Sequence, residues 1–210
     1  MNLLECLVGI ALCTLLINPL LKISADLWVK QMEYEKSQAL TSEAERALEL
    51  IGRAIRMAGY RNMKSAQEIA SKKNIKNSIE IQKGAGYQGS DSLLARHELS
   101  NEIDFDCIGN VLTNDRTKHN LALQGFLVER QAGLPKGAKI NGGSLMCQSL
   151  DRQGRIQNTT LMNGINHLKI DELNPSINQG QRAFRIKLEM TDGASLQKTF
   201  MRTFITRNLP

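Results

Sequence analysis

The sequence has few aromatic residues and lacks the motifs that mark common enzyme sites. Phenylalanine, tyrosine and tryptophan make up 4% of the 210 residues, whereas glycine is plentiful, with 16. This composition is typical of a loop-rich domain with a modest core. Neither the nucleophile motif G-x-S-x-G nor a C-x-x-C pair for zinc occurs. We therefore expect a protein that is not an enzyme and that binds no metal and no cofactor.

Two short matches to site motifs do not change this expectation. The S-x-x-K match from Ser195 to Lys198 lies where a turn enters a predicted strand, so its serine and lysine do not share a helical turn. The glycine-rich segment 84–89 (GAGYQG) lacks the long helix that should follow a dinucleotide-binding loop. The histidines show no ligand spacing, and we interpret them as surface or strand residues: His97, His119 and His167.

Charge is almost absent from residues 3–21, which read LLECLVGIALCTLLINPLL with Glu5 as the only charged residue. A helix of this length spans roughly 28 Å, close to the thickness of a hydrocarbon core. No basic segment precedes the run and no A-x-A site follows it, so a cleaved secretory signal fits poorly. A simple membrane anchor explains the length but not Glu5. The side chains expected in lipid include Leu3, Leu4, Leu7, Val8, Ile10, Leu12, Leu15 and Leu16, with Pro19 as a site of kinking or local melting.

Beyond residue 21 the pattern predicts that the same helix continues. Between Lys22 and Ala58 there is no proline and only one glycine, Gly52, and strong helix formers dominate. We predict one helix from about Asn2 to Ala58 that stops at Gly59. Its second half carries an apolar stripe with spacings of three and four, formed by Ala44, Ala47, Leu48, Ile51, Ala54, Ile55 and Ala58.

The rest of the chain shows short alternating runs between turn signals, which predict an antiparallel sheet. From Phe184 to Met190 every second residue is apolar, and we expect this face to pack on the helix stripe. The fold class is therefore α+β. We divide the chain into a transmembrane half of the helix (1–25), an amphipathic half (26–58) and a globular β domain (59–210). Strands are expected at 78–82, 92–97, 125–130, 144–150, 165–173, 183–190 and 196–206, with a helical turn at 66–71 and a loop at 101–120.

Two features of the β domain leave alternatives open. Cys107 and Cys147 lie near strand signals, and they form either a disulfide that contributes roughly 3 to 4 kcal/mol or two free buried thiols. The acidic loop 101–115 supplies oxygen ligands that calcium prefers, but its spacing fits no EF-hand, and we favour a solvated loop. Cys6 and Cys13, on the apolar helix, are too far apart to bond and are interpreted as small packing residues.

The first residues resemble a known family. MNLLECLVGIAL is similar to the mature N-terminus of type IV pilins and type II secretion pseudopilins, which begin with Phe or Met and carry Glu at the fifth position. The segment 46–62 (RALELIGRAIRMAGYRN) resembles the helix end of minor pilins of the PilW class, and 198–208 (KTFMRTFITRN) resembles their last strand. The resemblance covers nearly the whole chain and implies a ladle-shaped pilin fold, in which the apolar half of the helix (1–25) lies first in a membrane and then in the core of a fibre.

The resemblance also implies a role. Such subunits wait in the inner membrane with a periplasmic domain, and then join other minor pilins, the major pilin and often a tip adhesin at the pilus tip, where they prime assembly. A prepilin peptidase removes a leader and the new N-terminus is methylated, so Met1 is the expected processed end. Glu5 is expected to neutralise the amine of a neighbouring subunit and to fix its register; a glutamate that snorkels to the membrane edge is the alternative.

Two alternative functions remain. A J-type pseudopilin of a type II secretion system has a similar helix and sheet, and its partners on co-purification distinguish it. The formal net charge of +6 makes nucleic acid a possible partner, and a pilus-associated DNA-uptake subunit should bind duplex DNA with a steep salt dependence. Solvated lysines that serve solubility explain the same charge, so nucleic-acid binding is unsupported.

Overall fold

The computed structural model describes residues 3–62, 78–100, 102–118, 121–133, 142–173, 181–194 and 196–208. The side chains of Leu3, Glu5 and Cys6 are not described. The chain divides into two compact units, Met1–Thr41 and Ser42–Pro210, and each is described by itself below. The boundary falls inside the predicted amphipathic half of the helix, so the end of the helix and the β domain belong to one unit.

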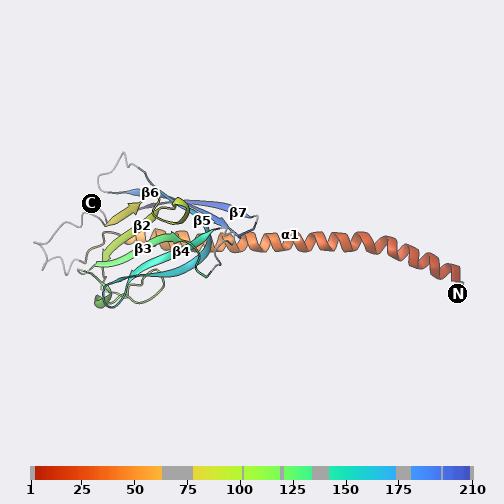
Figure 1. Cartoon of the computed structure of the whole chain (residues 1–210), viewed down its shortest axis with the longest axis horizontal. Helices are drawn as coiled ribbons and strands as arrows, with labels where there is room; N and C mark the ends of the chain where they lie inside the picture. The colour runs from red at the N-terminus through yellow and green to blue at the C-terminus, as the bar shows by residue number, and fades with distance from the viewer. Residues whose placement is uncertain are drawn as a thin grey trace, which may run out of the picture. The chain divides into compact units, whose positions relative to one another are not determined.

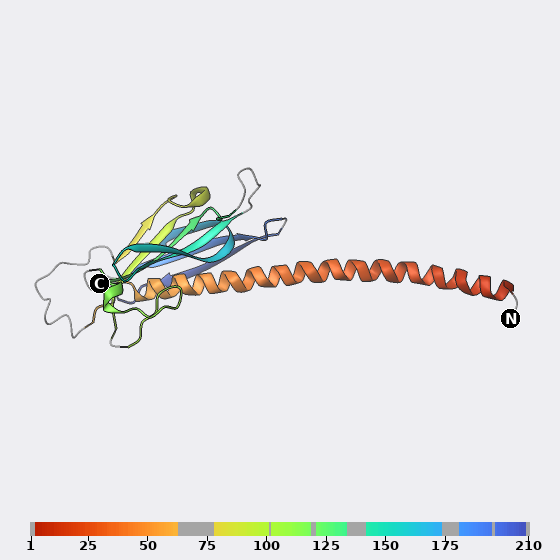
Figure 2. The same cartoon turned by 60° about the horizontal axis from the view of Figure 1, so that its bottom comes forward.

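A single helix, α1 (Leu3–Met57), accounts for the N-terminal part of the chain (Figures 1 and 2). It runs through Pro19 without interruption, so the predicted alternative of local melting is wrong. The helix ends where predicted, because Gly59 adopts a positive φ of 75° that favours glycine.

The second unit contains one antiparallel sheet in which seven strands follow one another in chain order (Figure 1). This confirms the predicted α+β class, and each predicted strand corresponds to an observed one. The strands are β1 (Ile79–Gln82), β2 (Ser92–Glu98), β3 (Leu121–Glu129), β4 (Gly143–Leu150), β5 (Ile156–Leu173), β6 (Ala183–Thr191) and β7 (Gln197–Ile205), with short 3-10 turns η1 (Tyr87–Gly89) and η2 (Asn114–Arg116).

Two strands begin earlier than predicted. β3 starts at Leu121 because its first residues pair with the end of β2. β5 starts at Ile156, directly after a tight turn in which the Asp151 carboxylate accepts hydrogen bonds from the Arg155 N–H at 2.8 Å and the Gln153 N–H at 2.9 Å. The polar sequence that follows has little intrinsic strand character, but pairing with β4 makes it a strand. The predicted helical turn at 66–71 lies outside the described residues.

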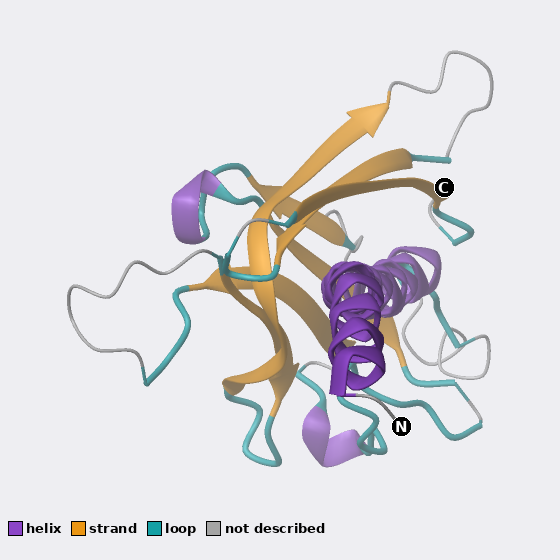
Figure 3. Ribbon diagram, turned by 90° about the vertical axis from the view of Figure 1, so that its right-hand side faces the viewer, coloured by secondary structure: helices purple, strands orange, loops and turns teal. Residues whose placement is uncertain are grey.

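The core lies between the last part of α1 and one face of the sheet (Figure 3). All seven residues of the predicted helix stripe are buried, as are the side chains on the apolar face of β6, and the two groups confirm the predicted packing. On β7, the ring of Phe204 lies directly over Gly52 of the helix. The buried residues of β6 are Phe184, Ile186, Leu188 and Met190.

A buried carboxylate ties the turn before β2 to the middle of the sheet. Asp91 accepts hydrogen bonds from the Ile170 N–H at 2.8 Å, the Gly84 N–H at 3.0 Å and Lys83 Nζ at 3.0 Å. Burial by itself raises the pKa of Asp91, but these hydrogen bonds outweigh burial and hold the pKa below its usual range. The carboxylate therefore stays ionised and links β5 to the chain that enters β2.

Candidate functional site

The first candidate site is the apolar surface of α1. Its side chains from Leu7 to Leu21 are exposed, and Leu4 is 72% exposed. The hydroxyl of Thr14 donates to the Ala11 carbonyl at 2.9 Å, so this polar group is satisfied within the helix. Cys13 is a free, exposed thiol. Seven of the side chains that were predicted to lie in lipid or in a fibre core are described, and all seven are exposed: Leu4, Leu7, Val8, Ile10, Leu12, Leu15 and Leu16. Pro19 lies on the same helix.

This surface is compatible with a membrane anchor. Within the described part of the chain, one helix is long and apolar enough to cross a membrane, with a mean hydropathy of 1.9 in its most apolar window. Glu5 lies in the first turn of α1, two residues after the helix begins, and Met1 lies outside the described residues. The predicted pairing between Glu5 and the amine of a neighbouring chain stays a prediction.

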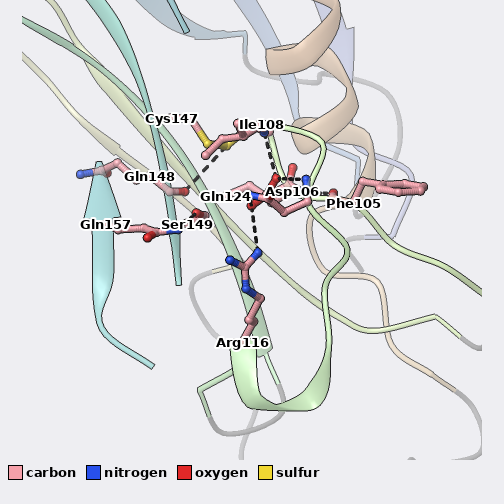
Figure 4. A network of polar contacts seen from close by, with 11 residues as sticks. Phe105, Asp106, Ile108, Arg116, Gln124, Cys147, Gln148, Ser149 and Gln157 are labelled. Carbon is pink, nitrogen blue, oxygen red and sulfur yellow. Dashed lines mark hydrogen bonds and ion pairs between the residues drawn. A yellow bond between two sulfur atoms is a disulfide. The ribbon is translucent and has the colours of Figure 1, made fainter. Parts of the chain in front are cut away.

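The second candidate site is the loop between β2 and β3, which a disulfide fixes to the sheet (Figure 4). Cys107 in the loop and Cys147 on β4 are bonded, with their Cα atoms 5.9 Å apart. This confirms one of the two predicted alternatives, and the free-thiol alternative is wrong. Both cysteines are buried, so the bond lies beneath the loop rather than on its surface.

Asp106 organises the turn that contains Cys107 (Figure 4). Its carboxylate accepts hydrogen bonds from the N–H groups of Ile108 at 2.9 Å and Asn110 at 2.8 Å, and it faces Arg116 at 3.5 Å. From β3, the side-chain amide of Gln124 donates to the Phe105 carbonyl at 2.9 Å. Charged and polar groups thus hold the loop in one conformation from several directions.

The prediction of a solvated acidic loop is wrong for two of its carboxylates. Asp104 and Asp106 are buried, because protein donors surround their oxygens. Asp104 accepts from the Ser100 N–H at 2.5 Å and from the Ser100 hydroxyl at 2.9 Å. Among the described residues no group of three histidine, cysteine or acidic side chains is placed to hold a metal ion. Asp115, by contrast, is exposed as predicted.

The remaining sequence candidates are not brought together. His97 is buried on β2, and burial lowers its pKa, as does Arg53, while the Asp104 carboxylate opposes the shift. His167 lies half-buried on β5, and His119 lies outside the described residues. The glycine-rich segment 84–89 leads into strand β2 rather than a helix, which agrees with its dismissal as a dinucleotide loop. Of the S-x-x-K match, Ser195 also lies outside the described residues.

Sequence reasoning missed the apolar surface that the loop presents. Ile103, Phe105 and Val111 are exposed, whereas the acids between them are buried. The signal was present in the alternation I-D-F-D at 103–106, but the surrounding Asn and Asp residues suggested a loop without a defined face.

Comparison of the chain with protein-family models, with curated proteins and with solved structures finds no match. The described architecture, a long apolar N-terminal helix whose last part packs on an antiparallel sheet, is compatible with a pilin-like fold. A function proposed for this chain therefore rests on three described features, which are the helix, the sheet and the disulfide.

Proposed function

We propose that this chain is a minor pilin subunit that primes the assembly of a type IV pilus and sits in its tip complex. The observation that supports this function is a lone carboxylate, Glu5, near the start of an apolar helix that continues without a break into a helix–sheet domain. An anchor alone needs the apolar length but not the charge. An assembling subunit needs both.

Glu5 has a physical reason to find a partner. A carboxylate in an apolar environment costs several kcal/mol unless a cation or several hydrogen-bond donors compensate it. Residues one and five of a helix lie one turn apart, about 6 Å along its axis. The terminal amine of a neighbour that is staggered by one turn therefore reaches the carboxylate, and this pairing sets the register of the incoming subunit.

The disulfide supports an extracytoplasmic position for the second unit. Disulfides persist in oxidising compartments such as the bacterial periplasm and are rare in the cytosol. Before assembly the apolar helix holds the protein in the inner membrane, with the Cys107–Cys147 domain in the periplasm. In the fibre the same helix packs among the helices of other subunits. The domain then contacts minor pilins, the major pilin or a tip adhesin, and it performs no catalysis.

The test replaces the carboxylate by Glu5→Gln in the full chain, expressed in cells that assemble the fibre. The matched control is Glu33→Gln, which removes an exposed carboxylate from the same helix outside the apolar run. Breaking one partner of a desolvated pair costs about 3 to 5 kcal/mol. We therefore expect Glu5→Gln to reduce the protein in sheared fibres at least about tenfold, with an unchanged amount in the membrane.

Equal incorporation of both variants would show that Glu5 has no role in assembly. Co-purification extends the test to the partner class. Pilus-type minor pilins are the expected partners, whereas subunits of a secretion system would contradict the tip-complex assignment.

A further inference from the structure

Part of the loop between β2 and β3 forms a two-stranded ribbon, defined here as residues 103–106 and 110–112. Phe105 and Val111 are antiparallel bridge partners, so their side chains project from the same face. The Asp106 N–H donates to the Asn110 carbonyl at 2.9 Å, and the Leu112 N–H donates to the Asp104 carbonyl at 2.8 Å. Successive side chains of the ribbon therefore alternate between two faces.

The ribbon buries its acids together with Leu112, and it exposes its other three apolar side chains. Asp104 and Asp106 point inward and are 9% and 4% exposed. On the opposite face, called the outer face below, the exposed fractions are 67% for Ile103, 38% for Phe105 and 47% for Val111. This pattern reverses the usual arrangement, in which apolar groups leave water and carboxylates stay in it. In Figure 4 the ring of Phe105 extends away from Gln124 and from the disulfide.

The outer face is held rigidly before any partner arrives. The disulfide fixes the turn of the ribbon to β4, and Gln124 of β3 binds the Phe105 carbonyl. Arg116 and the N–H groups of the turn fix Asp106. A surface that is already ordered loses little conformational entropy on binding, which is the feature that distinguishes a prepared binding surface from a floppy loop.

We propose that the outer face docks on a different subunit of the same fibre, at an apolar surface bordered by basic side chains. The proposal deepens the proposed function and rests on it for the class of the partner. It assigns the contact to three residues, Ile103, Phe105 and Val111, which no site motif in the sequence had marked.

Area argues against a second copy of this chain as the partner. The three exposed fractions correspond to roughly 300 Å² of accessible surface, whereas a stable interface buries about 800 Å² on each partner. The outer face alone therefore does not sustain a dimer. A neighbouring subunit is already held in the assembly by its own helix, so its effective concentration at the outer face is high. A contact of roughly 300 Å² is then sufficient.

Charge selects the chemistry of the partner. Of the exposed charged side chains in the same loop, Glu102 and Asp115 are acidic and Lys118 is basic, so carboxylates outnumber cations there. A symmetric contact between two copies brings these acids against each other, and an anionic lipid surface repels them as well. A basic border on the partner complements them and favours encounter in the correct orientation.

The experiment places a photo-crosslinking amino acid at single positions of the full chain in cells that assemble the fibre. Phe105 tests the outer face, and Leu12 on the apolar helix tests incorporation into the fibre. Ile156 is the matched control, because it is apolar and 57% exposed but lies on β5. The adducts are identified by mass spectrometry. We expect Phe105 and Leu12 to give adducts with other subunits of the fibre, and Ile156 to give at least about tenfold fewer.

The outcomes separate the two proposals. Adducts at Leu12 without adducts at Phe105 would refute the docking surface and leave the proposed function intact. Adducts of Phe105 with lipid or with a second copy would also refute the docking surface. If Leu12 gives only lipid adducts in cells with fibres, the proposed function fails, and the assignment of the partner fails with it.

A double variant provides an independent readout. Phe105→Ser with Val111→Thr removes the outer face without touching the buried acids, and Ile156→Ser is its control. With the crosslinker at Ile103, we expect the double variant to reduce the partner adduct about tenfold, and Ile156→Ser to leave it unchanged. An intact disulfide and unchanged resistance to protease show that both variants are folded. An undiminished adduct in the folded double variant would overturn the proposal.

Discussion

Replacing Gly52 by alanine should destabilise the protein, although the change improves the local helix propensity. Gly52 lies inside α1, where alanine is favoured over glycine by about 1 kcal/mol. Helix propensity alone therefore predicts that alanine at this position raises the free energy of unfolding by about 1 kcal/mol. The contact with β7 predicts the opposite, so the sign of the effect reports whether the helix packs on the sheet in this register.

The magnitude follows from the contact with Phe204. A Cβ atom at residue 52 would lie 2.3 Å from Cε1, 2.6 Å from Cδ1 and 2.7 Å from Cζ of that ring. Carbon atoms approach favourably to about 3.5 to 4.0 Å, so the ring has to move by more than 1 Å. Phe204 is 8% exposed, and the Cζ atom of Arg56 also lies over its ring, 5.8 Å from the ring centre. Overpacking of this kind costs about 1 to 3 kcal/mol. After the gain of about 1 kcal/mol in helix propensity is subtracted, the net loss is up to about 2 kcal/mol.

The assay is thermal and urea unfolding of the full chain in mild detergent, followed through the tertiary signal of the helix–sheet unit. A loss of this size lowers the Tm of a chain of this length by up to about 8 °C. In a Phe204→Ala background the obstacle is gone, and the same substitution should then stabilise by up to about 1 kcal/mol. A gain in stability in the wild-type background would refute the packing of Phe204 on Gly52.

Two further predictions concern the disulfide and the buried histidine. Replacing both Cys107 and Cys147 by serine should lower the free energy of unfolding by about 4 kcal/mol, because the bond closes a sequence separation of 40 residues in the unfolded chain; a loss below about 1 kcal/mol in urea unfolding would contradict this. The contribution of His97 to stability should be constant above about pH 6.5 and should fall as the pH drops below that value, because burial holds the pKa of His97 below its usual value and the unfolded chain binds the proton first. His97→Gln should flatten this pH profile, and a slope that survives the substitution would exclude His97 as its source.

Strong periodic patterns made most of the fold predictable from the sequence. The stripe from Ala44 to Ala58 and the alternation from Phe184 to Met190 each have one apolar face, so each needed a partner, and the two faces pack together. The start of β5 was not predictable in the same way. After Ile156, residues 157–160 are polar and show no alternation with apolar residues, and pairing with β4 makes them a strand.

The candidate sites were predictable to different degrees. The apolar helix and the position of Glu5 are explicit in the sequence, because a charge in an apolar run stands out without any tertiary information. The burial of Asp104 and Asp106 is not explicit, because it depends on donors from Ser100, Asn110 and Arg116 that only the folded loop brings together. The outer face of the ribbon is apolar because Asp104 and Asp106 point inward, so it could be recognised only from the structure.

The central claim is that Glu5 is neutralised by the amine of a neighbouring chain, and the intact mass of the subunit in purified fibres tests it most directly. The account predicts a polypeptide that begins at Met1, with a methylated amine and the Cys107–Cys147 bond formed. A subunit that retains additional residues before Met1 in the finished fibre would place its amine out of reach of Glu5 and would contradict the account.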